Sequence, residues 1–273
     1  IGYEARGAGE PVLFIAGLGR DRRMWDAQTA ALGARLRTVA FDNRGVGESS
    51  RPAGPYTAAQ MAEDAVGLLD ALELPRAHVV GASLGGVIAQ ELAMSFPHRV
   101  GRLALLCTHP GQPWAVPMSQ AVLAAIVPAP EADPYDRLLG AMKLAFGSRY
   151  WEAHAAELAA AARARLSSLP TPESWWAQAA AGAGFAWAGR KVKAPTLVMT
   201  GDDDNIVPAA NSATLRRLIP GAELAVIPGG GHYFFAEHPE PVNRLLADFL
   251  FAGEGEAPAD RCRKETMTCP SRT

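Results

Sequence analysis

A regular alternation between short apolar runs and segments of helical composition is the feature that most constrains the fold. The runs are short and mostly continuous, without the strict period of two that marks half-exposed strands. Such runs, separated by helices, are typical of a parallel sheet covered on both faces. The predicted strands lie at 12–16, 38–41, 79–80, 103–107, 196–199 and 224–227, and the predicted helices at 24–36, 58–72, 85–96, 209–218 and 241–251. The sequence therefore predicts an α/β fold with a mostly parallel, twisted sheet and helices on both faces.

This alternation is interrupted once, between residues 110 and 190. No strand is evident there, and a composition rich in Ala and Trp indicates several helices. About 80 residues are too many for a single crossover helix, so we expect a helical cap (lid) over the carboxyl edge of the strands, where ligands of open α/β sheets bind. The predicted core then comprises residues 1–109 and 191–252. From 253 to 273 the composition shifts to Gly, Pro and scattered charges, which favours a disordered tail.

Charge and cysteine content exclude several classes of function. A net charge of −2 offers no basic face for nucleic acid, and no apolar run approaches the ~20 residues of a membrane span. Cys107, Cys262 and Cys269 form neither a disulfide framework nor a metal-ligand spacing, so we expect no metal, core packing for Cys107, and a reducing cytoplasmic location. Because the chain opens with Ile1 rather than Met, we expect its natural start to lie upstream. The sequence does not indicate an oligomeric state.

Ser83 stands at the junction between a predicted strand and a predicted helix, in the stretch GASLG. Gly81 and Gly85 lie two residues before and two residues after it. A sharp strand-to-helix turn that holds a hydroxyl up for chemistry leaves no room for side chains at those two positions. The following helix also directs backbone amides and its positive dipole end toward any developing oxyanion. We therefore take Ser83 as the candidate nucleophile, the alternative being a tight βα turn with an incidental serine.

A serine nucleophile needs a histidine base and an acid that orients the base. Among six histidines, His232 follows the last predicted strand through a loop of three glycines. His109 follows a strand and could line the site, and His238, before a proline at a helix start, is the second choice as base, with helix capping as its expected role. We interpret the other three, His78, His98 and His154, as structural. The acid is expected after the strand TLVMT, which is followed by Asp202, Asp203 and Asp204.

Taken together, these motifs resemble those of the α/β-hydrolase superfamily, and the similarity extends from Gly2 to about Leu250. FIAGLG resembles the oxyanion segment, with Ala16 where relatives usually have His, and GASLGG resembles the nucleophile elbow. This resemblance implies that the backbone amides of Leu18 and Leu84 form the oxyanion hole. FDNRGVGES resembles the turn after the next strand, where Asp42 and Arg44 are structural. GDDDNIVP resembles the acid loop and singles out Asp204. The order Ser, Asp, His is that of the superfamily.

On this basis we expect a serine hydrolase that cleaves a carboxylic ester or lactone through an acyl-enzyme, with no cofactor. A serine at the elbow argues against haloalkane dehalogenases and epoxide hydrolases, which carry a carboxylate there, and against dienelactone hydrolases, which carry Cys. Three alternatives remain open. They are a carbon–carbon bond hydrolase, a cofactor-free perhydrolase, and a small-molecule receptor that retains the triad.

Apolar residues of the predicted cap are expected to roof the site. The pocket candidates are Trp114, Met118, Met142, Phe146, Trp151 and Trp176. Arg163 and Arg165 stand beside alanines, which is typical of a solvated helix face. Since ligand pockets are mostly apolar with few polar anchors, we expect a small-molecule ester or lactone with an apolar portion to be preferred over small, highly charged substrates.

Overall fold

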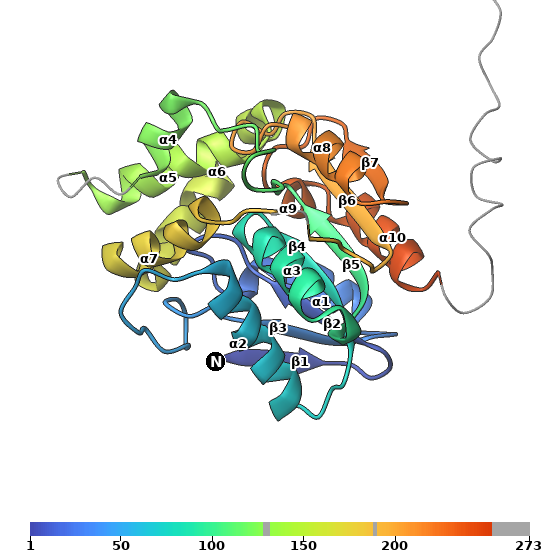
Figure 1. Ribbon diagram of the computed structural model, residues 1–273. Coiled ribbons are helices and arrows are strands. Elements are labelled where there is room, and N and C mark those ends of the chain that lie inside the picture. Colours follow the sequence, from blue (N-terminus) through green and yellow to red (C-terminus); the bar gives the residue numbers. More distant parts are fainter. Residues whose placement is uncertain (128–131, 188–189, 253–273) are drawn as a thin grey trace, which may run out of the picture.

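The computed structural model describes residues 1–127, 132–187 and 190–252. Within these ranges seven strands form one sheet in the order β1-β3-β2-β4-β5-β6-β7, and all neighbours are parallel except β1 and β3 (Figure 1). The strands are β1 (Tyr3–Arg6), β2 (Pro11–Ile15), β3 (Arg37–Phe41), β4 (Ala77–Ala82), β5 (Val100–Leu106), β6 (Thr196–Gly201) and β7 (Glu223–Ile227). The predicted fold class is thereby confirmed.

Helices cover both faces of the sheet, and two separate apolar clusters hold them there. Along β2, Leu13 and Ile15 enter one cluster while Phe14 enters the other, because successive strand side chains point to opposite faces. The first cluster includes side chains of α2 (Ala58–Ala71), α3 (Leu84–Ser95) and α8 (Ala210–Leu218); the second includes side chains of α1 (Asp26–Leu32), α9 (Phe234–Glu237) and α10 (Pro239–Leu250). Both faces of the central strands are therefore buried, which explains their continuous apolar sequences. Two short 3₁₀ turns, Arg22–Trp25 and Pro97–Arg99, precede α1 and β5.

Between β5 and β6 the chain forms the cap, a group of helices on one side of the sheet (Figure 1). Its elements are α4 (Gln120–Ile126), α5 (Pro134–Ala145), α6 (Ser148–Arg165), the 3₁₀ turn Leu166–Ser168, and α7 (Pro172–Ala183). Ser119, Asp133 and Thr171 cap the first amides of α4, α5 and α7 through their side-chain oxygens. A small apolar cluster of its own, Leu138, Met142, Phe146, Leu158 and Ala162, joins α5 to α6.

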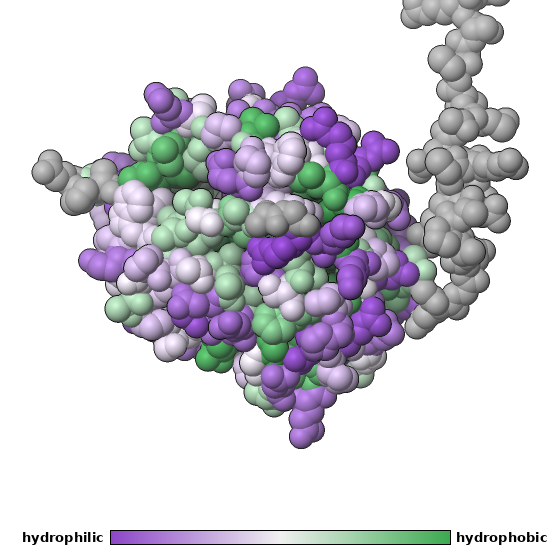
Figure 2. Space-filling model, in the orientation of Figure 1, coloured by the Kyte–Doolittle hydropathy of each residue, from purple (hydrophilic) through white to green (hydrophobic). Residues whose placement is uncertain are grey.

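Hydrogen bonds at several points tie the cap to the core. The side chain of Asn211 on α8 both accepts from the amide of Val116 (2.8 Å) and donates to its carbonyl (2.9 Å). The carboxylate of Asp203 accepts from the amide of Ser148 (2.6 Å) at the start of α6. Apolar side chains gather on the visible surface of the cap near α4 and α5 (Figure 2), and Leu123 on α4 is 47% exposed.

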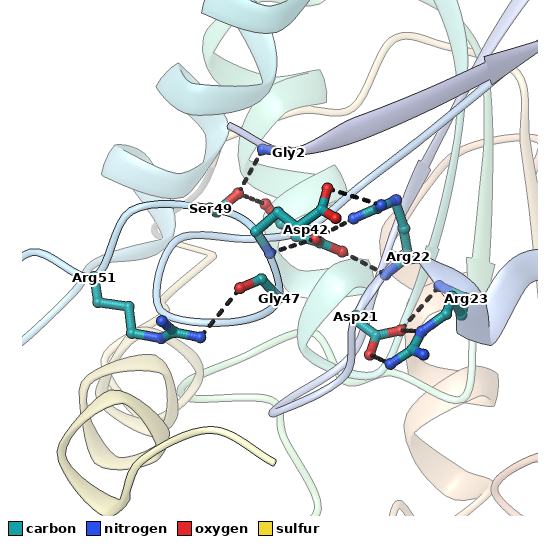
Figure 3. Close-up of polar contacts among 9 residues, drawn as sticks. Gly2, Asp21, Arg22, Arg23, Asp42, Gly47, Ser49 and Arg51 are labelled. Atoms are coloured by element: carbon teal, nitrogen blue, oxygen red, sulfur yellow. Dashed lines mark hydrogen bonds and ion pairs between the residues drawn. The ribbon is translucent and has the colours of Figure 1, made fainter. Parts of the chain in front are cut away.

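The turn after β3 is organised around the buried carboxylate of Asp42 (Figure 3). Asp42 accepts from the backbone amides of Arg22 (2.8 Å) and Glu48 (2.9 Å) and pairs with the Arg22 guanidinium. The hydroxyl of Ser49 donates to the Asp42 carbonyl and accepts from the amide of Gly2 (2.9 Å). Asp42 thus closes the turn against the start of the chain, and its carboxylate has a structural role.

Strand β1 does not follow from the apolar pattern. Its four residues, YEAR, are all exposed and polar or small, and they pair antiparallel with β3 at the edge of the sheet. An edge strand is held by backbone hydrogen bonds rather than by burial, so it carries no apolar signal. The expected tail at 253–273, with Cys262 and Cys269, lies outside the described residues. No helix in the described part of the chain is long and apolar enough to cross a membrane.

Candidate active site

Ser83 lies between β4 and α3 with a strained backbone conformation. Its φ is 55° and its ψ is −120°, which non-glycine residues rarely adopt. A Cβ at Gly81 would overlap the carbonyl of Gly85, and a Cβ at Gly85 would overlap the carbonyl of Ile15. Both glycines are therefore required by the close approach of backbone to backbone. The turn is bent in the way that the sequence pattern predicts.

The neighbouring strand β5 and the segment directly after it hold this turn in place on both sides of Ser83. The Ser83 amide donates to the carbonyl of Leu106 (2.9 Å), and the hydroxyl of Thr108 donates to the Ser83 carbonyl (2.7 Å). These bonds fix the backbone of Ser83, which lines a cavity between the sheet and the cap.

His232 follows β7 and contacts the acid loop that follows β6. Its Nδ1 lies 2.9 Å from Oδ2 of Asp204, and the side chains of both residues are almost fully buried. The second oxygen, Oδ1 of Asp204, accepts from the amides of Ile206 (2.8 Å) and Val207 (2.9 Å). With Oδ2 facing the ring, Nδ1 of His232 carries the proton of this bond, and Nε2 is the nitrogen available to act as a base.

Three consecutive aspartates thus have three different partners. Asp202 accepts from the amide of Gly229 (2.6 Å), and Asp203 accepts from the amide of Ser148 (2.6 Å), whereas Asp204 faces His232. Asp202 stabilises the turn before His232, and Asp203 anchors the start of α6. The structure places Asp204 where the sequence motif predicts the orienting acid.

A further carboxylate supports the glycine loop that carries His232. Glu237 accepts from the amides of Gly231 (3.1 Å) and Gly147 (3.2 Å), so it joins the loop to the cap. Burial raises the pKa of Glu237 to about 7, and the negative fields of Asp203 and Asp204 add to the shift. No sequence motif marks Glu237, because its partners are backbone amides remote in the sequence.

The segment after β2 passes directly beside Ser83. A Cβ on Gly17 would lie 3.4 Å from the Cβ of Ser83, and the Asn43 side chain holds the preceding carbonyl of Ala16 (2.9 Å). Leu18 follows on this segment, while Leu84 is the first residue of α3, and both line the same cavity as Ser83. The first amides of a helix have no intrahelical acceptor, so the Leu84 amide is free to bind an anion.

Gln178 on α7 of the cap connects the oxyanion segment to the turn after β3. Its Oε1 accepts from the amide of Gly19 (2.9 Å), and its Nε2 donates to the carbonyl of Arg44 (2.8 Å). The side chain is fully buried, and both of its polar atoms are satisfied. A lone glutamine in an Ala-rich helix gives no sequence signal for this contact across 159 positions.

Ser83 and His232 both line a cavity of about 900 Å³ between the sheet and the cap. Three of the predicted pocket residues, Met118, Met142 and Trp176, also line it. The other three do not, which corrects the prediction. Trp114 is half-exposed at the surface, and Phe146 and Trp151 pack in the cluster between α5 and α6.

Several lining residues were not predicted. They include Arg20, Arg165, Trp175, Phe185 and Tyr233. The expectation that Arg165 lies on a solvated helix face is wrong, because its guanidinium reaches the core and donates to the carbonyl of Gly19 (2.9 Å).

A comparison with known families fits this geometry. A model described as the alpha/beta hydrolase family matches residues 12–245. The chain belongs to the α/β-hydrolase family. It is 31% identical to the "Putative carbamate hydrolase RutD" of Azorhizobium caulinodans, over 90% of this chain and 93% of that protein. It is 30% identical to a poly(3-hydroxyalkanoate) depolymerase of Ectopseudomonas oleovorans, over 88% and 84% of the two chains.

Solved structures of the family give the same picture. The enol-lactonase of Burkholderia xenovorans LB400 superposes with a TM-score of 0.80 at 26% identity, covering 91% of this chain and 95% of that one. A meta-cleavage product hydrolase of Pseudomonas fluorescens IP01 also gives a TM-score of 0.80, at 25% identity, covering 91% and 93%. The α/β-hydrolase fold therefore extends over nearly the whole chain, while the relatives differ in the bonds that their names specify.

Other histidines of this hydrolase take different places. His109 lines the cavity as the sequence suggested, its Nδ1 lies 3.1 Å from the amide nitrogen of Gly111, and burial lowers its pKa. His238 is the residue before α10, but its side chain makes no capping hydrogen bond, contrary to the expected role.

Among the described residues no cluster of three or more His, Cys, Asp or Glu could hold a metal ion.

Proposed function

We propose that this hydrolase cleaves a carboxylic ester or lactone through an acyl-enzyme formed on Ser83. The observation that carries the proposal is the contact between His232 and Asp204. His232 lines the same cavity as Ser83, whose backbone is strained at the elbow. A buried histidine oriented by a buried carboxylate is the arrangement that activates a hydroxyl nucleophile.

In the first step Nε2 of His232 accepts the hydroxyl proton of Ser83 while its oxygen attacks the carbonyl carbon. The carbonyl oxygen becomes an anion, which the amides of Leu18 and Leu84 stabilise. The imidazolium then gives its proton to the departing alkoxide, and the acyl group remains on Ser83. Water, deprotonated by His232, hydrolyses the acyl-enzyme in a second cycle. Asp204 remains ionised throughout and stabilises the imidazolium.

The apolar wall of the cavity supports a substrate with an apolar portion. Met118, Met142, Phe185 and Trp175 contribute to this wall, and each buried methylene adds about 0.8 kcal/mol of binding until the cavity is full. A volume of about 900 Å³ accommodates a molecule of drug size.

The assay is hydrolysis of 4-nitrophenyl esters of increasing acyl length, together with a panel of lactones. We expect turnover that disappears in Ser83→Ala, with kcat/KM rising with acyl length. A protein that binds esters and never turns them over is a receptor, and that result would overturn the proposal.

A second candidate is a carbon–carbon bond hydrolase, favoured by the similarity to the meta-cleavage product hydrolase. Cleavage of a vinylogous 1,5-diketone faster than any ester or lactone would place this candidate first.

A further inference from the structure

Three arginines line the mostly apolar cavity, and two of them, Arg20 and Arg165, lie at one place on its wall; the third is Arg137. Arg165 is the last residue of α6, Arg20 follows the oxyanion segment, and both line the cavity. The guanidinium carbon of Arg20 lies 5.0 Å from the centre of the Tyr233 ring. The positive charge of Arg20 is also one of the causes that lower the pKa of Arg165. The two positive charges therefore share one part of the wall.

No acid neutralises this pair within the described part of the chain, since neither guanidinium forms an ion pair with a carboxylate there. Asp21 is the acid whose field reaches Arg165, but Arg23 already engages both of its oxygens (Figure 3). The NH2 of Arg23 lies 2.6 Å from Oδ2 of Asp21, and its Nε lies 3.1 Å from Oδ1. The carboxylate of Asp21 is therefore already paired with Arg23.

Arg165 also has hydrogen-bonding capacity to spare. Its NH2 donates to the carbonyl of Gly19 (2.9 Å), which uses one of the five N–H donors of a guanidinium. Burial, followed by the charge of Arg20, lowers the pKa of Arg165 to about 10, so the side chain is still protonated at neutral pH. A desolvated cation without a counter-ion is costly, and an anionic ligand would offset that cost.

We propose that Arg165 and Arg20 bind a carboxylate of the substrate, so that the ester or lactone carries a free acid group in addition to its apolar portion. Guanidinium groups match a planar carboxylate with paired N–H donors. Cleavage of such a substrate rests on the proposed function, whereas binding of its carboxylate does not depend on Ser83. The expected apolar portion of the substrate is retained, and a single carboxylate is added to it.

The position of Arg165 also limits the distance between the carboxylate of the substrate and the bond that is cleaved. Arg165 holds the carbonyl of Gly19, the residue next to Leu18, whose amide is assigned to the oxyanion hole. Two residues of extended chain span about 7 Å, and a hydrogen bond of about 3 Å follows at each end, so the guanidinium lies within roughly 13 Å of the reacting carbonyl oxygen. A chain of about four methylenes between carbonyl and carboxylate fits within this limit.

The kinetic test compares two esters with the same six-carbon acyl chain, 4-nitrophenyl hydrogen adipate and 4-nitrophenyl hexanoate. Their ratio of kcat/KM values isolates the terminal carboxylate from any general effect on catalysis. In Arg165→Met we expect this ratio to fall by about 10- to 100-fold, the range for losing a charged hydrogen bond. Arg20→Met should lower it in the same direction. Arg163→Met is the matched control, since Arg163 lies on the same helix over the Tyr135 ring and outside the cavity.

If Arg165 serves only to hold the Gly19 carbonyl, Arg165→Met slows both esters equally and the ratio stays constant. That result would overturn the proposal. Arg165→Lys provides a second variant that keeps the charge, and a ratio between those of wild type and Arg165→Met is expected.

A binding measurement separates this inference from the proposed function. Calorimetric titration of Ser83→Ala protein with monomethyl adipate, and separately with dimethyl adipate, needs no turnover. We expect monomethyl adipate to bind at least tenfold more tightly than dimethyl adipate, and this preference to disappear in the Ser83→Ala/Arg165→Met double variant. Equal binding of the two esters by the Ser83→Ala protein would refute the carboxylate site, whether or not the wild type cleaves any ester.

Discussion

Replacing Asp204 with Asn tests the role of the acid with a minimal change of shape. Its carboxylate makes three contacts, two with the amides of Ile206 and Val207 and one with Nδ1 of His232. The amide oxygen of Asn would replace Oδ1 and keep both backbone bonds. The Asn nitrogen would then face His232 and present N–H groups to Nδ1, which must become an acceptor.

The histidine consequently changes tautomer, so that Nε2 carries the proton and is no longer a base. We expect Asp204→Asn to lower kcat by about 10⁴, equivalent to about 5.4 kcal/mol of lost transition-state stabilisation. Folding should change little, by about 1 kcal/mol or less, because a single side-chain bond is altered. The assay is 4-nitrophenyl butyrate hydrolysis beside urea unfolding of the same preparation.

Asp202→Asn and Asp203→Asn are the matched controls on the same loop. Each retains an oxygen that can accept the single backbone amide it binds, from Gly229 or Ser148. We expect kcat losses below about tenfold for both. If Asp203→Asn were the crippling change and Asp204→Asn were active, the assignment of the acid would be wrong.

Three other predictions concern residues around the triad. Gly85→Ala should cost about 3 kcal/mol of stability or more, since its Cβ meets the backbone carbonyl of Ile15; an unchanged urea midpoint would contradict this. Because burial raises the pKa of Glu237 to about 7 from 4.5, the folded state holds that proton more tightly than the unfolded chain, so stability falls as pH rises from about 4.5 to 7. Glu237→Gln should remove this part of the pH dependence of Tm, and an identical dependence in the variant would show that another group causes it. Gln178→Leu leaves the Gly19 amide and a second backbone group unpaired, so both Tm and kcat should drop; a variant with lower Tm and normal kcat would restrict Gln178 to folding.

The core fold and the candidate triad could be predicted because their signals are local. Ser83 is marked by glycines two positions away, and His232 and Asp204 each follow a predicted strand, so that parallel topology brings them to one edge. The edge strand β1 could not be predicted, since backbone pairing alone holds its exposed residues.

Cavity residues could not be assigned from apolar character alone. Amphipathic cap helices have one face toward the cavity and another toward each other, and Phe146 and Trp151 belong to the second. Helix α6 is also interrupted at His154, where φ is −123° and ψ is 18°, so one continuous period does not describe it. Arg163 and Arg165 are two positions apart, about 200° around a helix, and so cannot share a solvated face.

The central claim is that Ser83 becomes acylated during turnover. Its most direct test is mass spectrometry of the protein after reaction with a fluorophosphonate, with peptide mapping of the adduct and assay of the residual activity. One adduct per chain, on the Ser83 peptide, with activity lost in proportion to labelling, is the predicted result. An adduct on any other residue, or full ester turnover by protein that is quantitatively labelled at Ser83, would contradict the mechanism.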